Sequence, residues 1–291
     1  MVKYKNIIKL YIIIPIVFIC IYIFVFCKLN LYNENRIYSI RKVPIEYRIS
    51  LLKNFIDKKY QKNSILLLGD SQPNGYMYPE DLIFSKLLEK KLNKNILNLA
   101  FQDSRIIDNT IILQYLLEKG MKFNSIIFNV NQSHIKDSGF SHLMNDNNQD
   151  YVYGILKSTK AFVNFVENPN PIMRPFEDLQ LRKYGNNYFE INSKLMEEYI
   201  LKLKVFINIA KSLTDNLIIY VTPHALNAVE YNNKNDIEIL NKFKIDFLIF
   251  CKNQNIKCIN IDISEDIFFI DIVHFNSKGH KKMSQILSEY L

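Results

Sequence analysis

The sequence predicts an α/β fold, in which helices cover both faces of a five-stranded parallel sheet, as in a flavodoxin-like three-layer sandwich. The first observation is a set of short, largely apolar runs that recur along the chain. The second is that segments with helical spacing of apolar residues separate these runs. Strands that are apolar at successive positions are typical of parallel sheets buried on both faces. With 291 residues, of which 48% are hydrophobic, the chain can build one substantial core.

Five apolar runs are predicted as the strands of this sheet. They lie at 64–68, 95–99, 125–130, 216–221 and 256–261. The last run is interrupted by Lys257 and Asn260, which predicts an edge strand with one face toward solvent.

Helices are predicted where apolar residues recur at helical spacing between the strands. The segment 106–118 precedes Lys119 and Gly120, which form a C-terminal stop. The last helix begins at Ser277, the expected N-cap, and runs to the end of the chain. The longer amphipathic helices are expected at 193–213 and 236–253.

The N-terminal segment differs in kind from the rest of the chain. Residues 10–27 contain no charge, and as a helix they would be roughly 27 Å long, enough to cross a bilayer. We therefore expect 1–28 to form a single transmembrane anchor. The polar segment 29–61 is expected to be a stalk, with an amphipathic lead-in helix at 46–60.

A cleaved secretory signal peptide is the competing interpretation of the N-terminal run. The run is longer than the roughly 7 to 15 residues of a usual signal core, and no small-x-small cleavage site follows Cys27. An uncleaved anchor is therefore favoured. Basic residues lie on both sides of the run, so the positive-inside rule does not decide its orientation.

Charge and cysteine content limit the classes of function. The net charge is +8, but the lysines are scattered and form no dense basic run with interleaved aromatics, so nucleic acid is not expected as a partner. Two cysteines lie in the apolar run. The other two, Cys251 and Cys258, form neither a CxxC pair nor a metal quartet. They could form one disulfide outside the cytoplasm or remain as two buried thiols.

The segment 62–291 is expected to be one domain with an insertion around 132–192. The insertion is rich in asparagine and proline and has a helical stretch near 151–166. It follows the third strand, and open α/β sheets bind ligands beyond the carboxyl ends of their strands. The insertion is therefore placed where a lid or an acceptor site would lie.

Two short motifs at this edge of the sheet can supply a catalytic triad. Gly69, Asp70 and Ser71 follow the first strand, while Asp271 and His274 precede the last helix. A serine hydroxyl becomes a good nucleophile when a histidine takes its proton and a carboxylate orients the histidine. The spacing of Asp271 and His274 lets a turn bring both side chains to one side. Ser71, His274 and Asp271 are therefore the predicted catalytic residues.

Each motif also has a plain structural interpretation. Asp70 could bond local backbone amides in an ordinary turn, and Asp271 could cap the last helix. Finding both motifs at one edge of the same α/β pattern favours the triad. His134, His142, His224 and His280 carry less weight, because they form no metal-ligand spacing, and we expect neither a metal nor a cofactor.

The chain resembles the SGNH or GDSL-type hydrolases and acyltransferases over roughly 64–291. The first block of that family resembles residues 67–71, and its Asp-x-x-His block resembles residues 271–280. The resemblance implies an oxyanion hole formed by Ser71, Ala100 and Asn131. Two departures stand out, because Ala100 replaces the usual glycine of the second block and the third block keeps Asn131 without its flanking Gly and Asp. Donors aimed at the developing oxyanion stabilise the transition state.

The resemblance implies a serine esterase or O-acyltransferase that works through a Ser71 acyl-enzyme. Similar members with one N-terminal span often modify surface polysaccharides or teichoic acids, some beside a multispanning membrane acyltransferase. It implies an extracytoplasmic catalytic domain and an acylated polysaccharide or other envelope ester as substrate, with acetyl as the expected acyl group. The alternatives are a non-catalytic, membrane-tethered glycan-binding or scaffolding protein of similar fold, and a lipid-acting esterase.

Overall fold

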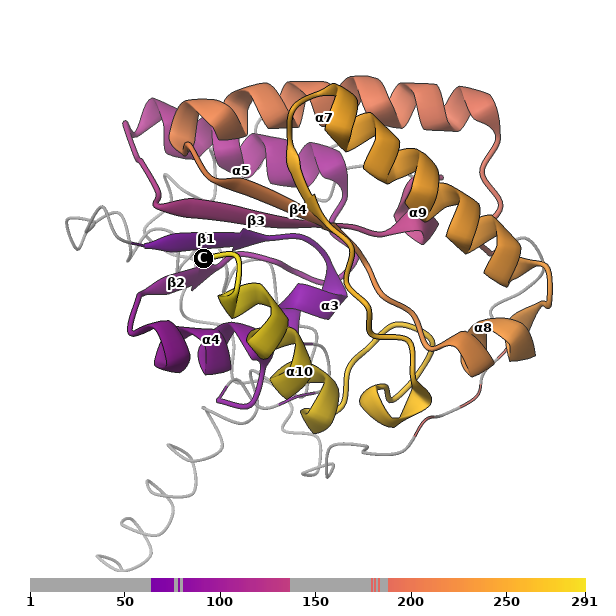
Figure 1. Ribbon diagram of the computed structural model, residues 1–291. Coiled ribbons are helices and arrows are strands. Elements are labelled where there is room, and N and C mark those ends of the chain that lie inside the picture. The colour runs from indigo at the N-terminus through magenta and orange to yellow at the C-terminus, as the bar shows by residue number, and fades with distance from the viewer. Residues whose placement is uncertain are drawn as a thin grey trace, which may run out of the picture.

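The computed structural model describes residues 64–75, 78, 81–136, 179, 181, 183 and 188–291. The predicted anchor at 1–28, the stalk at 29–61 and most of the predicted insertion lie outside the described residues. Within the described part of the chain, no helix is both long and apolar enough to span a membrane. The described residues form a parallel sheet between two layers of helices (Figure 1).

The sheet contains five parallel strands in the order β2-β1-β3-β4-β5. This is the flavodoxin-like strand order, so the predicted fold class is confirmed. The strands are β1 (Ile65–Leu68), β2 (Ile96–Asn98), β3 (Ser125–Val130), β4 (Leu217–Val221) and β5 (Lys257–Ile259).

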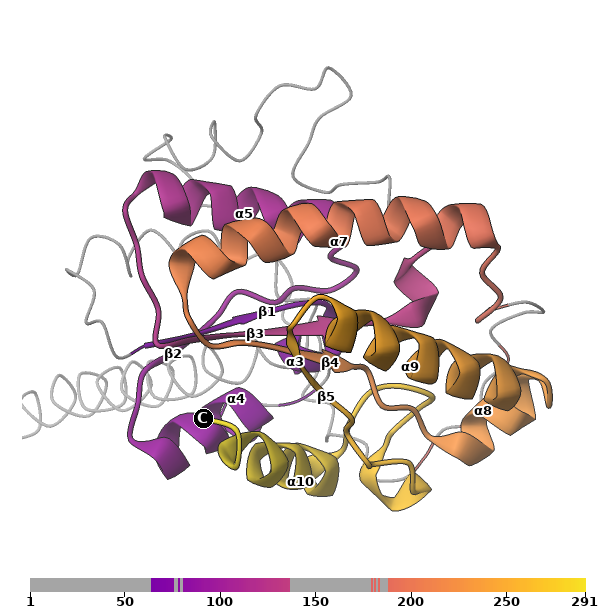
Figure 2. The same cartoon turned by 45° about the horizontal axis from the view of Figure 1, so that its top comes forward.

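Alternate residues of the central strands face the two helical layers, because successive side chains of a strand point to opposite faces. Leu66 and Leu68 of β1 belong to the core beneath α5 (Ile106–Glu118) and α7 (Ser193–Leu213). Their neighbours Ile65 and Leu67 belong to the core against α4 (Phe84–Leu92) and α10 (Ser277–Ser288). Figure 2 shows the two layers on opposite sides of the sheet.

The remaining helices complete the C-terminal half of the fold. They are α8 (Leu226–Asn232) and α9 (Asp236–Asn253). Phe243 and Phe247 of α9 pack into the core shared with α7. The strand β5 lies at the edge of the sheet, and Lys257 is exposed there, which confirms the predicted edge strand.

The ends of the helices confirm one sequence prediction and correct another. Gly120 follows α5 with a φ of 67°, in the left-handed region that glycine adopts readily. The N-cap of α10 is Asn276 and not Ser277, because the Asn276 side chain accepts a hydrogen bond from the Gly279 amide at 3.0 Å. The helix also ends at Ser288, earlier than predicted.

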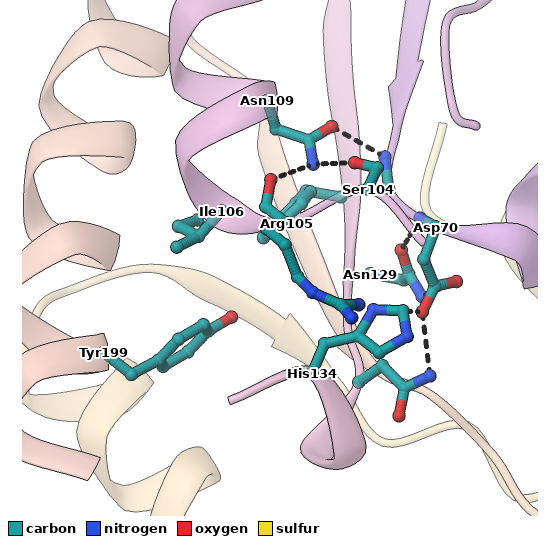
Figure 3. Close-up of a pocket in the computed structure, with 11 residues that line it drawn as sticks. Asp70, Ser104, Arg105, Ile106, Asn109, Asn129, His134 and Tyr199 are labelled. Carbon is teal, nitrogen blue, oxygen red and sulfur yellow. Dashed lines mark hydrogen bonds and ion pairs between the residues drawn. The ribbon is translucent and has the colours of Figure 1, made fainter. Parts of the chain in front are cut away.

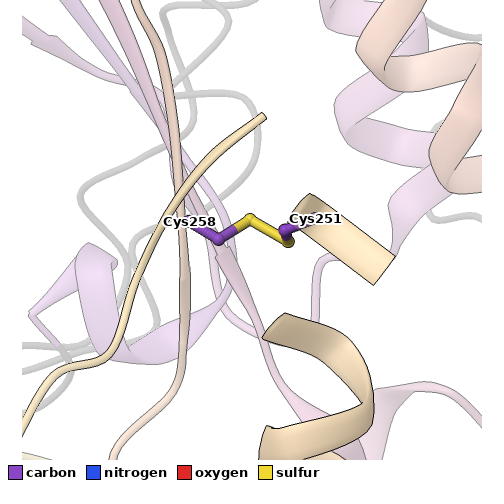
Figure 4. Close-up of a disulfide and its surroundings, with 2 residues drawn as sticks. All are labelled: Cys251 and Cys258. Carbon is purple, nitrogen blue, oxygen red and sulfur yellow. A yellow bond between two sulfur atoms is a disulfide. The ribbon is translucent and has the colours of Figure 1, made fainter. Parts of the chain in front are cut away.

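A disulfide joins the last turn of α9 to β5. Cys251 and Cys258 are bonded, with their Cα atoms 5.9 Å apart (Figure 4). Of the two alternatives that the sequence left open, the structure contains the disulfide and not two free thiols.

Candidate active site

The turn after β1 places Ser71 at the carboxyl edge of the sheet. Ser71 is the first residue of the short helix α3 (Ser71–Asn74), and Asp70 is its N-cap. The Asp70 side chain accepts a hydrogen bond from the Gln72 amide at 3.0 Å. Ser71 is 7% exposed, so the residue is almost wholly buried.

The turn can form only because Gly69 lacks a side chain. Its φ is 137°, and an added Cβ would lie 1.8 Å from Oδ1 of Asn129. That same oxygen accepts a hydrogen bond from the Asp70 amide at 3.1 Å. The Gly69 amide donates to Oδ1 of Asn109 on α5 at 3.1 Å. Two buried asparagines therefore hold the backbone that leads into Ser71.

The loop before α10 brings His274 to Ser71. The Nε2 atom of His274 lies 2.8 Å from Oγ of Ser71. Its Nδ1 atom lies 2.8 Å from Oδ2 and 3.0 Å from Oδ1 of Asp271. Because an ionised carboxylate only accepts hydrogen bonds, Nδ1 carries the proton in the neutral ring and Nε2 is left to accept from Ser71. The structure thus brings together the three residues that the sequence predicted as a triad.

Asp271 is held in its ionised form. Burial acts to raise its pKa, but the charge of His274 and hydrogen bonds from the His274 ring and from the Val273 and His274 amides outweigh burial, so its pKa is lowered. The two amides donate to Oδ1 at 2.9 and 2.8 Å. A carboxylate fixed in this way can orient the His274 ring and stabilise its charged form.

The predicted oxyanion donors differ in whether their hydrogens are available. Ser71 is the first residue of a helix, so the helix itself does not use its N–H. The Ala100 amide donates to Oδ1 of Asn98 at 3.1 Å, so this structure does not add support to its predicted role, which stays a prediction. Asn131 donates one N–H to Oδ2 of Asp70 at 2.8 Å, and its amide group carries a second. The role of Asn131 stays a prediction.

A second carboxylate and imidazole pair lies directly behind the nucleophile turn. Nδ1 of His134 is 3.3 Å from Oδ2 of Asp70, and both side chains line a small cavity with Arg105 and Tyr199 (Figure 3). The cavity measures about 10 Å³. This is enough for one water molecule and too small for a substrate.

The Asp70 carboxylate is charged within this cluster. Burial acts to raise its pKa, but His134 and hydrogen bonds from Asn131, Gln72 and Asn129 outweigh burial, so the pKa is lowered. Burial lowers the pKa of His134, although the charge of Asp70 opposes this. Asp70 therefore serves as a buried acceptor that several donors surround, in addition to capping α3.

Two of the remaining histidines are buried and pack against aromatic rings. His224 meets the Phe189 ring edge to face at 5.1 Å, and burial lowers its pKa to about 4. His280 lies 5.1 Å from the Tyr78 ring and accepts a hydrogen bond from the Phe84 amide. Burial lowers the pKa of His280 to about 3. His142 lies outside the described residues.

Sequence reasoning missed three side chains that shape the site, namely Asn129, His134 and Gln72. Asn129 carries a usable signal, because an asparagine inside an otherwise apolar strand needs buried partners. The pairing of His134 with Asp70 joins the ends of two strands, and no local spacing reveals it. In the described part of the chain, His, Cys, Asp and Glu form no group of three or more that could hold a metal ion.

No protein-family model matches the chain, and neither does any curated protein. Solved structures of similar fold include a lipolytic protein of the G-D-S-L family from Veillonella parvula, at 13% identity and a TM-score of 0.48, covering 78% of this chain and 96% of that one. A GDSL-like lipase from Bacteroides thetaiotaomicron has 8% identity and a TM-score of 0.49, and the match covers 84% of this chain and 97% of that one. A carbohydrate acetylesterase family member from Sinorhizobium meliloti has 10% identity and a TM-score of 0.44, and the match covers 78% of this chain and 96% of that one. At these sequence identities and TM-scores the solved structures support no residue roles, so the roles are assigned from the geometry of this chain.

Proposed function

We propose that this chain is a membrane-anchored serine esterase or O-acyltransferase that acts on acyl esters of cell-envelope glycans, with acetyl as the expected acyl group. The observation that carries the proposal is the continuous series of hydrogen-bond distances from Ser71 through His274 to Asp271. Oγ and Nε2 are 2.8 Å apart, and Nδ1 and Oδ2 are 2.8 Å apart. These are the distances that proton transfer to a general base requires.

The reaction follows from this arrangement. His274 takes the hydroxyl proton as Oγ of Ser71 attacks the ester carbonyl, and the carbonyl oxygen becomes an oxyanion. The Ser71 amide and the second N–H of Asn131 are the proposed donors to that oxygen. Collapse of the intermediate expels the alcohol, which takes the proton from His274 and leaves an acyl group on Ser71.

The acceptor in the second half of the cycle decides the class of enzyme. His274 removes a proton from the acceptor as it attacks the acyl-enzyme, and Ser71 leaves with that proton restored. Water as the acceptor gives an esterase. A glycan hydroxyl gives an O-acyltransferase, for which a multispanning membrane acyltransferase is the proposed partner.

The proposed location outside the cytoplasm has two supports. The uncharged run at 10–27 is long enough to anchor the chain in a membrane. The disulfide between Cys251 and Cys258 is of a kind that persists in oxidising compartments. Envelope esters are the substrates that a site tethered there would meet.

Catalysis is favoured over a purely scaffolding role for a specific reason. A binding protein has no need of a partly buried aspartate whose pKa is lowered by the histidine that contacts the serine. Such a pair is costly to bury and has a clear use in proton transfer.

The test is turnover by the full-length chain in detergent. We expect hydrolysis of 4-nitrophenyl acetate, and release or transfer of acetate with O-acetylated oligosaccharides. Free acetate alone identifies an esterase, and an acetylated acceptor identifies a transferase. The Ser71→Ala variant is the matched control. Equal turnover by folded wild type and Ser71→Ala, or none by either with every ester, would contradict the proposal.

A further inference from the structure

Gln72, the residue after the nucleophile, connects the catalytic serine to the loop that carries the catalytic histidine. Its side chain is 1% exposed. Its Nε2 atom donates to the backbone oxygen of Val273 at 2.7 Å and to that of Pro223 at 3.2 Å. Gln72 thus follows Ser71 in the chain and bonds the residue that precedes His274.

These two bonds join three segments that are far apart in the sequence. Gln72 lies in α3 after β1, Pro223 lies in the loop after β4, and Val273 lies in the loop before α10. The latter two loops are also joined to each other, because the Ala225 amide donates to the Ile272 oxygen at 3.0 Å. The Gln72 amide therefore fills the junction where the nucleophile turn meets both loops.

The orientation of the Gln72 amide follows from its partners. Both partners are carbonyl oxygens, which only accept, so the nitrogen and not the oxygen must face them. The Gln72 oxygen is buried and has no hydrogen-bond partner among the described residues. Leaving a buried oxygen unpaired lowers stability. We therefore expect the two bonds that the Gln72 nitrogen donates to have a function that offsets this loss.

We propose that Gln72 is a positioning residue, which holds the His274 loop against the Ser71 turn so that Nε2 stays within hydrogen-bond distance of Oγ. The inference rests on the proposed serine chemistry and adds a residue to it. Without the two donors, Val273 loses its bond to α3, and the mean separation of Nε2 and Oγ increases. Displacements of about 1 Å in such a contact can reduce turnover by roughly a hundredfold.

Two substitutions separate hydrogen bonding from packing. Gln72→Met keeps the length of the side chain and removes both donors. Gln72→Glu keeps the shape of the side chain but points an oxygen at two carbonyl oxygens. We therefore expect Gln72→Glu to have a lower kcat than Gln72→Met. If Gln72 served only to fill space, Gln72→Glu would be the closer to wild type.

The matched control is Thr214→Val, which removes two hydrogen bonds at the opposite edge of the sheet. The Thr214 hydroxyl donates to the Asn124 oxygen and accepts from the Asn216 amide, both at 3.1 Å, and the residue is 6% exposed. This variant reports the effect of losing two partly buried hydrogen bonds away from the site.

Two measurements on the full-length chain test the inference. In ester hydrolysis, we expect Gln72→Met to lower kcat by roughly ten- to a hundredfold with KM near the wild-type value. In hydrogen–deuterium exchange, we expect the peptide containing Asp271 to His274 to exchange faster. Thr214→Val should change neither quantity.

The outcomes distinguish this inference from the proposed function. An inert wild type would contradict serine catalysis, and deuterium exchange would still show whether Gln72 holds the loop. An active wild type with unchanged kcat and unchanged exchange in Gln72→Met would overturn the inference. An equal fall of kcat in Thr214→Val would overturn it as well.

Discussion

Asn129 and Asp70 are joined by two hydrogen bonds that run in opposite directions. The Asp70 amide donates to Oδ1 of Asn129 at 3.1 Å, and Nδ2 of Asn129 donates to Oδ1 of Asp70 at 2.9 Å. Nδ2 also donates to Oγ1 of Thr222 at 2.8 Å, which ties the pair to the end of β4. The turn before Ser71 is therefore held by Asn129 of the neighbouring strand β3, and Asn129 is itself held by Thr222, in the way that a preorganised site requires.

Gly69→Ala should abolish activity and lower the free energy of unfolding by several kcal/mol. The new Cβ would overlap Oδ1 of Asn129, and a φ of 137° is unfavourable for alanine. Urea unfolding of the full-length chain measures this loss. Gly120→Ala is the control, because φ is 67° but no atom lies within 4 Å of the added Cβ. Equal losses in the two variants would contradict the role of the close contact.

Asp271→Asn should reduce kcat by roughly 10³- to 10⁴-fold without unfolding the protein. The amide removes the negative charge that stabilises protonated His274, and it allows the ring to adopt the wrong tautomer. Because the pKa of Asp271 is lowered in the wild type, the carboxylate stays ionised throughout the neutral range. Its titration should therefore cause no rise or fall of activity with pH in that range. Steady-state kinetics between pH 5 and 9 check this. A variant with wild-type kcat would exclude Asp271 from the triad.

The protein should lose stability as the pH falls from 6.5 toward 4. In the folded state the pKa of His224 is about 4 and that of His280 is about 3, against an ordinary value of 6.5. Both values are depressed, so the unfolded state binds protons first as the pH falls. The stability that each neutral ring contributes is complete above pH 6.5 and decreases by roughly 1.4 kcal/mol per pH unit below it.

Urea unfolding at several pH values between 7 and 4.5 tests this account. The His280→Phe variant should show a shallower pH dependence than wild type, whatever its stability at pH 7, because one titrating group is gone. If the slope is unchanged in the variant, His280 in the folded wild type takes up its proton near the ordinary histidine pKa of 6.5, which would contradict the account.

Loss of the disulfide should destabilise the fold by about 2 to 3 kcal/mol, the entropy expected for closing a short loop. The bond joins Cys251 and Cys258, which are separated by 7 positions. Urea unfolding with and without a reductant measures the effect. A Cys251→Ser, Cys258→Ser double variant is the control and should not respond to the reductant. A wild type that is equally insensitive would contradict the presence of the bond.

Much of the fold could be predicted from the sequence, because strands buried on both faces are apolar at most positions. The run at 125–130 coincides with β3, and the helices 106–118, 193–213 and 236–253 coincide with α5, α7 and α9. Shorter helices were missed. In α4, five polar residues among nine hide the apolar face, while Phe84 and Leu88 are buried.

The triad was predictable because the chemistry specifies its residue types and the strand order places them at one edge. The oxyanion donors were harder to predict, because they depend on which hydrogens are already engaged. The Asn98 side chain takes the Ala100 amide two residues further on, as in a local Asx turn. The bond from Asn131 to Asp70 joins residues 61 positions apart, so it depends on a tertiary contact and not on local spacing.

Covalent labelling with a fluorophosphonate tests the central claim most directly. The probe reacts with serines that a neighbouring base activates, so the full-length wild type should be labelled on the peptide that contains Ser71, as mapped by mass spectrometry. The Ser71→Ala and His274→Ala variants should remain unlabelled while retaining the circular dichroism spectrum of the wild type. A folded wild type that fails to react, or labelling that persists in Ser71→Ala, would contradict the account.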